Sequence, residues 1–384
     1  MKASSSRRNF LTASLGLPVT GLGAGFSRPL TLSPSSSPEI RYRTLGKTGL
    51  KVSTVGFGCM ITSDASVIEK AADLGVNYFD TARGYQGGNN ERMVGAALKK
   101  RRKHIVLSTK THGETKQAAL ADLDTSLREL GTDYVDIWYL HAKSKPSEIT
   151  EELIDAQETA KKAGKVRFVG VSTHSGQTEL IPALIAGGKT DVVLVAFNFT
   201  MGKDMEDAVA AASRAGLGVV AMKVMAGGYR RAKPGDKLNE IFKRQGAMVA
   251  ALKWVLKNPH VHTTVPSITD MDQLDDNLKA MSEPYTEADQ KLLASQLERI
   301  RPIYCHMCGE CEKNCPEGLP IADILRYVMY ADGYGQFALG REQFLTLSEE
   351  ATPARCKLCP TCTVTCPYGV NVARQLRRAQ ELFA

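Results

Sequence analysis

The chain has 384 residues and a formal net charge of +8 at pH 7, with 43% hydrophobic and 23% charged residues. This length and composition suit a soluble protein of about two domains. The positive charge is spread along the chain without interleaved aromatic residues, so we expect no nucleic-acid partner.

The N-terminal segment is typical of an export signal. Arg7 and Arg8 precede a Gly-rich apolar stretch over residues 15–26 and a Pro/Ser-rich segment that ends at Pro38; the pattern resembles a twin-arginine (Tat) signal. The stretch is shorter than the roughly 20 residues of a membrane-spanning helix, so no stable span is expected. We predict that residues 1–38 are a signal peptide and linker and that the protein is exported to the periplasm. A retained N-terminal anchor is the alternative, because no Ala-x-Ala cleavage site follows.

Residues 41–300 alternate short apolar strands with amphipathic helical segments, which is the pattern of a parallel sheet with crossover helices. Eight strands are expected, and their number predicts an α/β fold of the (β/α)8 TIM-barrel type, with strands buried on both faces. A doubly wound sheet is the alternative, although no Gly-x-Gly-x-x-Gly follows the first strand. The expected strands are 54–59, 78–81, 105–109, 135–140, 167–172, 192–197, 218–223 and 263–266.

Polar residues follow three of these strands at their carboxyl ends, where barrel enzymes hold their catalytic groups. Asp80 and Tyr85 follow the second strand, Lys110 the third and His141 the fourth. Taken singly, Asp80 could cap a helix, Lys110 could be a surface charge and His141 could be a core histidine. Their shared position at one face of the barrel predicts a catalytic site.

Several segments of the expected barrel resemble the aldo-keto reductases. The resemblance implies that Asp80, Tyr85, Lys110 and His141 reduce a small carbonyl compound, or oxidise an alcohol, with a nicotinamide cofactor. It is carried by 43–53 (Arg-Thr-Leu-Gly-Lys-Thr-Gly-Leu-Lys-Val-Ser), 77–82 (Asn-Tyr-Phe-Asp-Thr-Ala) with Tyr85, Asn90-Glu91, 108–110 (Ser-Thr-Lys), Leu140-His141 and 170–172 (Gly-Val-Ser).

The four residues also suit this reaction on physical grounds. A hydride that reaches a carbonyl carbon leaves negative charge on the oxygen, so a proton donor must lie beside that oxygen. Tyr85 is the expected donor, with its pKa lowered from about 10 by the Lys110 ammonium. Asp80 would hold Lys110 charged and in place, and His141 would orient the carbonyl oxygen.

The residues around the expected nicotinamide ring depart from the family pattern. Ser172 is kept, but Thr173 stands where Asn is usual, Leu194 replaces a Gln, and Met222 replaces the stacking aromatic residue. The residues expected around the ring therefore make NAD(P)H a possible cofactor and do not establish that it binds.

The expected adenosine end departs as well. Ser267 and Gln273 occupy the places of the basic phosphate clamps, so a 2′-phosphate would lose its charge-assisted hydrogen bonds and the choice between NADH and NADPH stays open. His174 and Lys223, on the same rim, are alternative contacts, against the simpler interpretation that they are ordinary surface residues. The residues that we assign to the cofactor are Ser172, Met222, Lys223, Ser267, Asp276 and Asn277.

Eight of the nine cysteines form two copies of one run, Cys-x2-Cys-x2-Cys-x3-Cys-Pro, near the C-terminus. Three thiolates at this spacing can hold three corners of a four-iron cluster, and the fourth, before Pro, tends to bind the other cluster in two-cluster proteins. We expect two 4Fe-4S clusters with exchanged fourth ligands. One set is Cys305, Cys308, Cys311 and Cys366, and the other is Cys356, Cys359, Cys362 and Cys315.

Structural zinc and disulfides are the alternatives for these cysteines. Zinc sites usually pair two short knuckles across a longer loop, and thiols this close in sequence cannot all pair as disulfides without strain. The ninth cysteine, Cys59, lies in an apolar stretch and is expected to be a buried packing residue.

Residues 301–384 are predicted to form a small, mainly α-helical, two-cluster ferredoxin-like domain. Apolar residues at helical spacing predict helices over 321–330 and 372–383, each after a Cys-Pro and a Gly turn. With the barrel, this tail resembles the branch of the aldo-keto reductases that is fused to a ferredoxin-like domain. Aromatic residues between the cysteine runs are expected to pack rather than to carry electrons; they are Tyr327, Tyr330, Tyr334, Phe337 and Phe344.

These features together predict an exported oxidoreductase whose barrel interconverts carbonyl and alcohol and whose clusters exchange electrons with a redox partner protein or carrier. One alternative is an electron-transfer protein whose barrel is a non-catalytic docking or ligand-binding module, which the altered cofactor positions favour. Another is non-redox carbonyl chemistry with purely structural clusters. The intact set of four rim residues favours the enzyme.

Overall fold

The computed structural model describes residues 39–228, 246–348 and 361–384, with Cys356 and Cys359 between them. The predicted signal peptide and linker, residues 1–38, lie outside the described residues, so export stays a prediction. Pro38–Ala384 forms one compact unit. Within the part of the chain that the structure describes, no helix combines the length and apolar character needed to cross a membrane.

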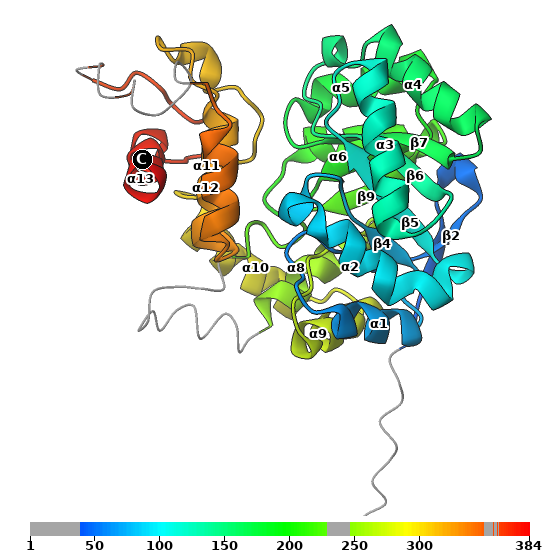
Figure 1. The fold of residues 1–384 in the computed structure, drawn as a ribbon. Helices are drawn as coiled ribbons and strands as arrows, with labels where there is room; N and C mark the ends of the chain where they lie inside the picture. The colour runs from blue at the N-terminus through cyan, green and yellow to red at the C-terminus, as the bar shows by residue number, and fades with distance from the viewer. Residues whose placement is uncertain (1–38, 229–245, 349–355, 357–358, 360) are drawn as a thin grey trace, which may run out of the picture. The chain divides into compact units, whose positions relative to one another are not determined.

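Eight parallel strands form the centre of the fold (Figure 1). They are hydrogen-bonded in chain order, and isolated parallel bridges from Val55 to Thr264 and from Gly58 to Ser267 join the two edges. This closure confirms the predicted (β/α)8 barrel over the doubly wound sheet. The strands are β3 (Phe57–Gly58), β4 (Tyr78–Asp80), β5 (Val106–Thr111), β6 (Val135–Leu140), β7 (Val166–Thr173), β8 (Val192–Ala196), β9 (Gly218–Met222) and β10 (Thr263–Thr264).

Helices surround the strands, and several begin at a side-chain cap (Figure 1). Asp64, Thr115 and Thr150 each accept a hydrogen bond from a backbone N–H in the first turn, which satisfies a donor that has no partner within the helix. The helices of the barrel are α1 (Ala65–Asp73), α2 (Asn89–Leu98), α3 (Lys116–Leu130), α4 (Glu151–Lys162), α5 (Gln177–Gly187), α6 (Lys203–Arg214), α8 (Ala247–Leu256), α9 (Met271–Ser282) and α10 (Glu287–Ile300).

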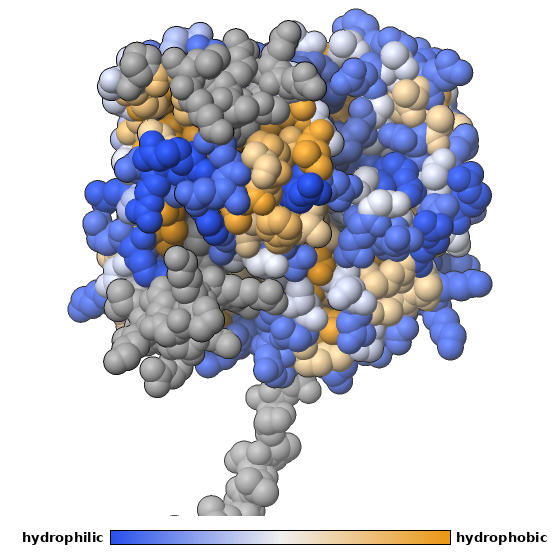
Figure 2. Space-filling view, turned by 60° about the vertical axis from the view of Figure 1, so that its left-hand side comes forward, coloured by the Kyte–Doolittle hydropathy of each residue, from blue (hydrophilic) through white to orange (hydrophobic). Residues whose placement is uncertain are grey.

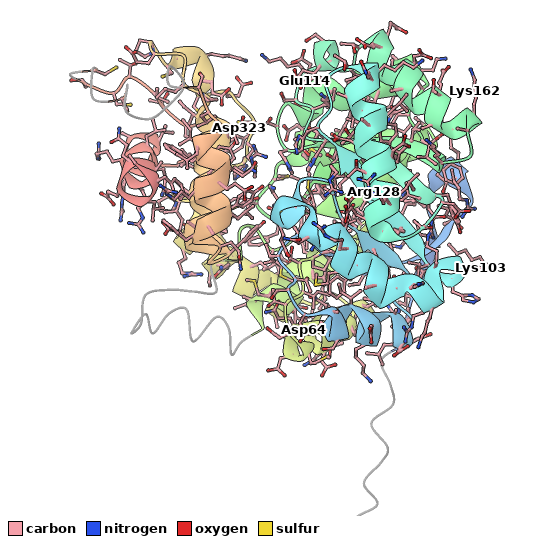
Figure 3. All side chains as sticks on the ribbon, viewed as in Figure 1. Asp64, Lys103, Glu114, Arg128, Lys162 and Asp323 are labelled. Carbon is pink, nitrogen blue, oxygen red and sulfur yellow. The ribbon has the colours of Figure 1, made fainter. Side chains whose placement is uncertain are left out.

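Apolar side chains fill both faces of the strands. All five residues of β8 are buried, because one face of the strand meets the packed barrel interior and the other meets the helices. Charged residues lie outside this core, and Figure 3 shows Lys103 and Lys162 pointing away from the barrel. Cys59 is completely buried in the core, as predicted.

The C-terminal tail has a hydrophobic core of its own, which includes Tyr304, Ile324 and Leu376. It contains α11 (Ile321–Val328), α12 (Phe337–Leu345) and α13 (Val372–Phe383), and a π-helical turn over Met329–Gly333 continues α11. α11 and α13 agree with the two helices predicted from apolar spacing, and α12 was not predicted. The boundary between the barrel and the tail at residues 300 and 301 remains a prediction.

Hydrophilic side chains cover much of the face in Figure 2, and an apolar area lies near its centre. Among the described residues, the large apolar side chains with high exposure include two on α12, Phe337 at 48% and Leu345 at 58%. For Phe337, the expectation of simple interior packing is therefore only partly met, because half of its side chain is open.

An antiparallel hairpin, β1 (Tyr42–Thr44) with β2 (Lys51–Ser53), precedes the barrel. Its turn packs against the segment before β9: the Lys47 N–H donates to the Gly216 carbonyl at 2.7 Å. Gly46 has a φ of 49°, and a Cβ atom there would lie 2.5 Å from the Gly216 oxygen. A side chain at this position therefore has neither the backbone conformation nor the space that it needs.

Replacing Gly46 by Ala should destabilise the protein more than replacing Gly49, which also has positive φ but has nothing within 4 Å of its missing Cβ. Gly49→Ala pays the conformational cost of roughly 1–2 kcal/mol, and Gly46→Ala adds about 1–3 kcal/mol for the steric overlap. Anaerobic urea unfolding of the two cluster-loaded variants measures the difference. Equal loss of the free energy of unfolding would show that the contact with Gly216 is not a constraint.

Candidate active site

A buried ion pair lies at the carboxyl ends of β4 and β5. Lys110 is 2% exposed and Asp80 is 4% exposed, and the Lys110 Nζ donates to Asp80 Oδ2 at 2.6 Å and to the Thr81 carbonyl at 2.7 Å. Ser108 Oγ donates to the other carboxylate oxygen at 2.7 Å. A buried ammonium is tolerated only when oxygens of this kind replace its water, so Asp80 and the Thr81 carbonyl hold Lys110 in one position, and Ser108 holds Asp80.

Tyr85 lies next to this pair. The Lys110 Nζ is 3.3 Å from the Tyr85 hydroxyl, and the ammonium lies 4.8 Å from the centre of the Tyr85 ring. The sequence-predicted neighbours Asp80, Lys110 and Tyr85 are therefore brought together by the fold.

Buried polar side chains fix the loop that carries Tyr85. Thr81 Oγ1 donates to Asn90 Oδ1 at 2.6 Å, and Thr109 Oγ1 donates to Glu91 Oε1 at 2.6 Å. The start of α2 is thereby tied to β4 and β5. This explains why Asn90 and Glu91 accompany the rim residues in the sequence pattern.

The protonation state of Tyr85 differs from the expectation. Burial, and next the charge of Asp80, raise the pKa of Tyr85 well above its usual value. Burial lowers the pKa of Lys110, against the attraction of Asp80. The prediction that Lys110 lowers the pKa of Tyr85 is therefore wrong for the protein without ligands, because the cost of burying a phenolate outweighs the attraction of an ammonium already bound to Asp80. The phenol is protonated at neutral pH.

His141, at the end of β6, faces the same space. Its ring centre lies 5.8 Å from that of Tyr85, nearly perpendicular to it, and 4.1 Å from that of His112, on which it stacks. Burial, with a further contribution from His112, lowers the pKa of His141 well below its usual value, so the imidazole is neutral. Its Nδ1 has no hydrogen-bond partner among the residues that the structure describes.

Asp80, Tyr85, His112 and His141 line a cavity of about 410 Å³. Part of its wall comes from the tail rather than the barrel, and two contacts anchor that wall. The Asn198 Nδ2 donates both to the Tyr304 hydroxyl at 2.8 Å and to the Lys223 carbonyl at 3.0 Å. The tail residues of the wall include Arg326, Tyr327, Tyr330, Tyr334, Glu342 and Gln343.

The sequence reasoning missed these tail residues and His112. His112 carried a signal, since it directly follows β5. Helical spacing places Arg326, Tyr327 and Tyr330 on one side of an otherwise apolar helix, together with Asp323. A polar stripe of this kind indicates a functional surface. Tyr327 and Tyr330 are buried in the packing of the tail, as expected, but they also line the cavity.

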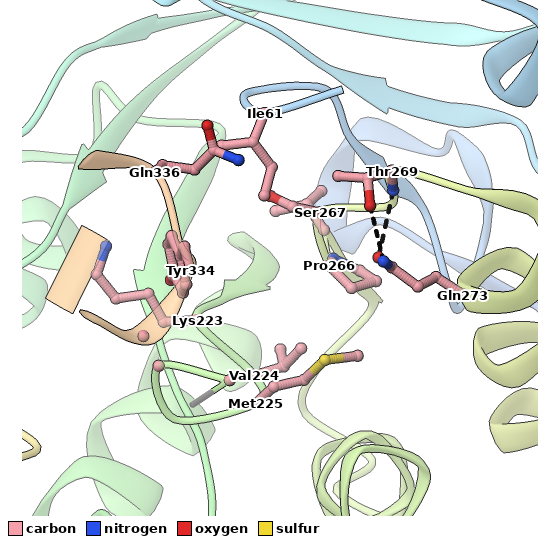
Figure 4. A pocket seen from close by; sticks show the side chains of 14 residues that line it. Ile61, Lys223, Val224, Met225, Pro266, Ser267, Thr269, Gln273, Tyr334 and Gln336 are labelled. Carbon is pink, nitrogen blue, oxygen red and sulfur yellow. Dashed lines mark hydrogen bonds between the residues drawn. The ribbon is translucent and has the colours of Figure 1, made fainter. Parts of the chain in front are cut away.

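A second cavity, of about 150 Å³, adjoins the first and shares Lys223, Ser267 and Tyr334 with it (Figure 4). Ser267 precedes a loop closed by Gln273, whose Nε2 donates to Thr269 Oγ1 at 2.7 Å. The expected cofactor residues Lys223 and Ser267 thus line the same groove. Among the described residues that line this second cavity, Lys223 is the one that can carry a charge.

The remaining expected cofactor residues are placed less favourably. Met222 lines the larger cavity, while the Ser172 Oγ accepts the Ala142 N–H at 2.9 Å and is fully buried. Asp276 and Asn277 lie on α9 and are absent from the lining of both cavities described above. Asn277 is 2% exposed, and its Nδ2 lacks a hydrogen-bond partner among the described residues.

The cysteines of the tail are arranged in two mixed groups. Burial raises the pKa of Cys308 and raises that of Cys311 to about 12, and the nearby Cys366 raises both further. Burial also raises the pKa of Cys356 and Cys359, to which Cys315 contributes. The fourth cysteine of each run thus lies near the other run.

No three described His, Cys, Asp or Glu side chains converge closely enough to hold a single metal ion. A four-iron cluster distributes its thiolates over several iron atoms, so its ligands need not meet at one point as those of structural zinc do. Thiols with raised pKa values must lose their protons when a metal binds, so loading of these sites releases protons.

The barrel, the rim residues and the cysteine tail together define the class of protein. Residues 62–298 match the aldo/keto reductase family, and residues 304–372 match a 4Fe-4S dicluster domain. The chain therefore belongs to the aldo/keto reductase family and carries a C-terminal iron-sulfur domain. It is an oxidoreductase, and the substrates of its family are small carbonyl compounds.

Known relatives match the barrel over nearly their whole length. The uncharacterized oxidoreductase YqkF of Bacillus subtilis is 28% identical over 303 residues, which cover 68% of this chain and 97% of YqkF. The aldo-keto reductase AKR11C1 of Bacillus halodurans (holo form) superimposes with a TM-score of 0.58 at 27% identity, covering 66% of this chain and 96% of that one. An aldo-keto reductase from Klebsiella pneumoniae, solved in complex with NADPH, superimposes with a TM-score of 0.56 at 24% identity. The match covers 67% of this chain and 95% of that one.

The raised pKa of Tyr85 predicts that this phenol does not ionise below about pH 10, the value of a free tyrosine. The ultraviolet difference between the wild type and Tyr85→Phe, followed during an alkaline titration of the ligand-free protein, isolates this one residue. A tyrosinate signal that develops below pH 9 would contradict the effect of burial.

Proposed function

We propose that the barrel interconverts a small carbonyl compound and its alcohol with NAD(P)H, and that two 4Fe-4S clusters in the tail exchange electrons with a redox partner. One observation carries the catalytic part of the proposal. The buried Lys110 Nζ lies 2.6 Å from Asp80 Oδ2 and 3.3 Å from the Tyr85 hydroxyl, and Asp80 and Tyr85 line a cavity together with His141.

A nicotinamide cofactor, when bound, supplies or accepts the hydride. In carbonyl reduction Tyr85 gives its proton to the oxygen on which negative charge develops, and Lys110 stabilises the phenolate that remains. The neutral His141 ring can donate one hydrogen bond to the same oxygen. In alcohol oxidation the proton moves the other way, which the raised pKa of Tyr85 makes less favourable in the ligand-free protein.

The residues fit a nicotinamide cofactor in part. Two cavities share Lys223 and Ser267, so a groove leads from Tyr85 to the loop before α9. The related Klebsiella enzyme was solved with NADPH, but here Ser267 and Gln273 offer no charge to a 2′-phosphate, so we propose NAD(P)H without a preference for NADPH.

The proximity of Cys366 to the first cysteine run and of Cys315 to the second supports two clusters with exchanged ligands. The hydride from NAD(P)H supplies both electrons for one carbonyl and Tyr85 supplies the proton, so two clusters that each carry one electron would, with one proton, return the oxidised cofactor to NAD(P)H. Tyr304 precedes Cys305, and its hydroxyl accepts a hydrogen bond from the Asn198 side chain, which also donates to the Lys223 carbonyl. The first cysteine run is thus joined to the cavity wall by a short chain of bonds.

The N-terminal pattern of Arg7 and Arg8 with the following apolar stretch supports export of the loaded protein to the periplasm by the twin-arginine route. A cofactor-containing protein suits this route, because the route is associated with proteins that fold and load their cofactors first.

A second candidate is an electron-transfer protein whose barrel binds a ligand without turnover. The small volume of the second cavity, about 150 Å³, favours it, because a whole dinucleotide needs more room than such a cavity offers. The precise contacts around Lys110 favour the enzyme, since a docking module has no need of a buried ammonium beside a phenol.

Replacing Tyr85 by Phe should lower kcat for aldehyde reduction about 10²–10⁴-fold, because the proton donor is lost. NAD(P)H affinity and iron content should stay at wild-type values. Tyr78→Phe, which removes a buried hydroxyl from β4 that bonds to Tyr139 instead of Lys110, is the matched control and should keep its turnover. Turnover that is unchanged in Tyr85→Phe would exclude Tyr85 as the proton donor.

Double variants test the exchanged cluster ligands. Cys308→Ser and Cys366→Ser remove ligands of one proposed cluster, so the pair should lose about four of eight irons, as each single variant does. Cys359→Ser with Cys366→Ser removes ligands of both clusters and should lose nearly all iron. Cys59→Ala is the control with full iron. The reverse ranking of the two double variants would mean that each run binds its own cluster.

A further inference from the structure

The tail supplies a positive charge to the wall of the catalytic cavity. Arg326 of α11 is 9% exposed and lines the cavity of about 410 Å³. One terminal nitrogen, Nη2, donates to Asp323 Oδ1 at 2.7 Å, and Asp323, labelled in Figure 3, is 43% exposed at its side chain. This pair holds the guanidinium in place beside the cavity.

The Arg326 Nε has no hydrogen-bond partner within the described part of the chain. A buried N–H without a partner is unfavourable, because it has lost its hydrogen bond to water and gained none in the protein. The guanidinium is a fork of fixed geometry that suits a planar carboxylate. A group that enters the cavity with a negatively charged oxygen would satisfy this N–H.

Lys223 approaches the same cavity from the barrel. It follows β9 with a φ of 55°, a left-handed conformation that is uncommon for residues other than glycine and often marks a functional position. Its Nζ lies 3.3 Å from His174 Nδ1 and 5.6 Å from the ring centre of Tyr330. Neither neighbour carries a negative charge to balance an ammonium.

Among the described residues that line the cavity, Lys223 is a basic residue without an acidic partner, whereas Arg326 is paired with Asp323. Asp80 is bound to Lys110, and Glu342 lies on the exposed side of α12. Burial and the charge of Arg326 hold the pKa of Lys223 well below its usual value, which shows how unfavourable a second cation is here. An anion placed between Arg326 and Lys223 would relieve this repulsion.

We propose that the substrate carries a carboxylate, which Arg326 and Lys223 bind while its carbonyl group lies against Tyr85 and His141. This inference rests on the proposed function and names the substrate class. The iron-sulfur tail then has a second role, because the barrel by itself would lack Arg326. It completes the site that selects the substrate.

Binding of succinate to the cluster-loaded, full-length protein tests the anion site without turnover. Isothermal titration should show saturable binding to the wild type and to Tyr85→Phe, and about 10- to 100-fold weaker binding to Arg326→Met and to Lys223→Met. Arg378→Met is the matched control. It removes an arginine from the same domain that pairs with Asp332 and does not line the cavity, so succinate affinity should stay unchanged.

Turnover of a matched pair of aldehydes, succinic semialdehyde and butanal, separates the anion site from the reaction. Arg326→Met should raise KM for succinic semialdehyde about 10-fold or more while leaving KM for butanal and the Kd for NADPH within twofold of the wild type. Equal losses for both aldehydes, or a matching loss of NADPH affinity, would overturn the substrate site in favour of a cofactor contact.

The two failures are distinguishable. If succinate fails to bind the wild type while butanal is reduced, the carboxylate site is wrong and the proposed reaction stands. If neither aldehyde reacts but succinate binding depends on Arg326, the reaction is wrong and the anion site stands. Should Arg326→Met fail to fold, Arg326→Gln, which keeps a polar side chain without the charge, gives the same comparison.

Discussion

The geometry of the site depends on one buried ion pair. An ammonium taken out of water costs several kcal/mol unless its partners replace the lost solvation, and Lys110 has such partners in Asp80 and the Thr81 carbonyl. The strand register provides them: Asp80 of β4 lies opposite Ser108 of β5, and Ser108 and Lys110, two residues apart, point to the same face. The loop that carries Tyr85 then needs only to place its hydroxyl beside the Lys110 ammonium, which these partners hold in a fixed position.

The tail changes what this barrel site can do. In the described structure the catalytic cavity is closed partly by α11, and Tyr304 ties the tail to the barrel through Asn198. Because of these contacts, the tail lies beside the proposed catalytic residues and forms part of the wall of the cavity where a substrate would bind. The proposed electron exchange through the cysteines and the proposed selection of the substrate by Arg326 both depend on this one packing arrangement.

Much of this could be predicted from the chain, because local patterns determine it. Strand and helix spacing gave the barrel and α13, and the rim residues Asp80, Lys110 and His141 followed from the ends of strands. Arg326 could not be placed, because its role depends on how α11 packs against barrel residues that are distant in sequence, such as Lys223 after β9. The predicted direction of the pKa shift of Tyr85 was wrong for a similar reason. The sequence spacing indicates that a charge lies nearby, but it does not show the burial that outweighs that charge.

The most direct test of the catalytic claim is an anaerobic titration of the cluster-loaded protein with NADH and NADPH, alongside iron and sulfide analysis. We predict about eight irons per chain and saturable binding of a nicotinamide cofactor at one site per chain. Full iron content with no binding of either cofactor at millimolar concentration would contradict the claim. The barrel would then be a ligand-binding module attached to an electron-transfer protein.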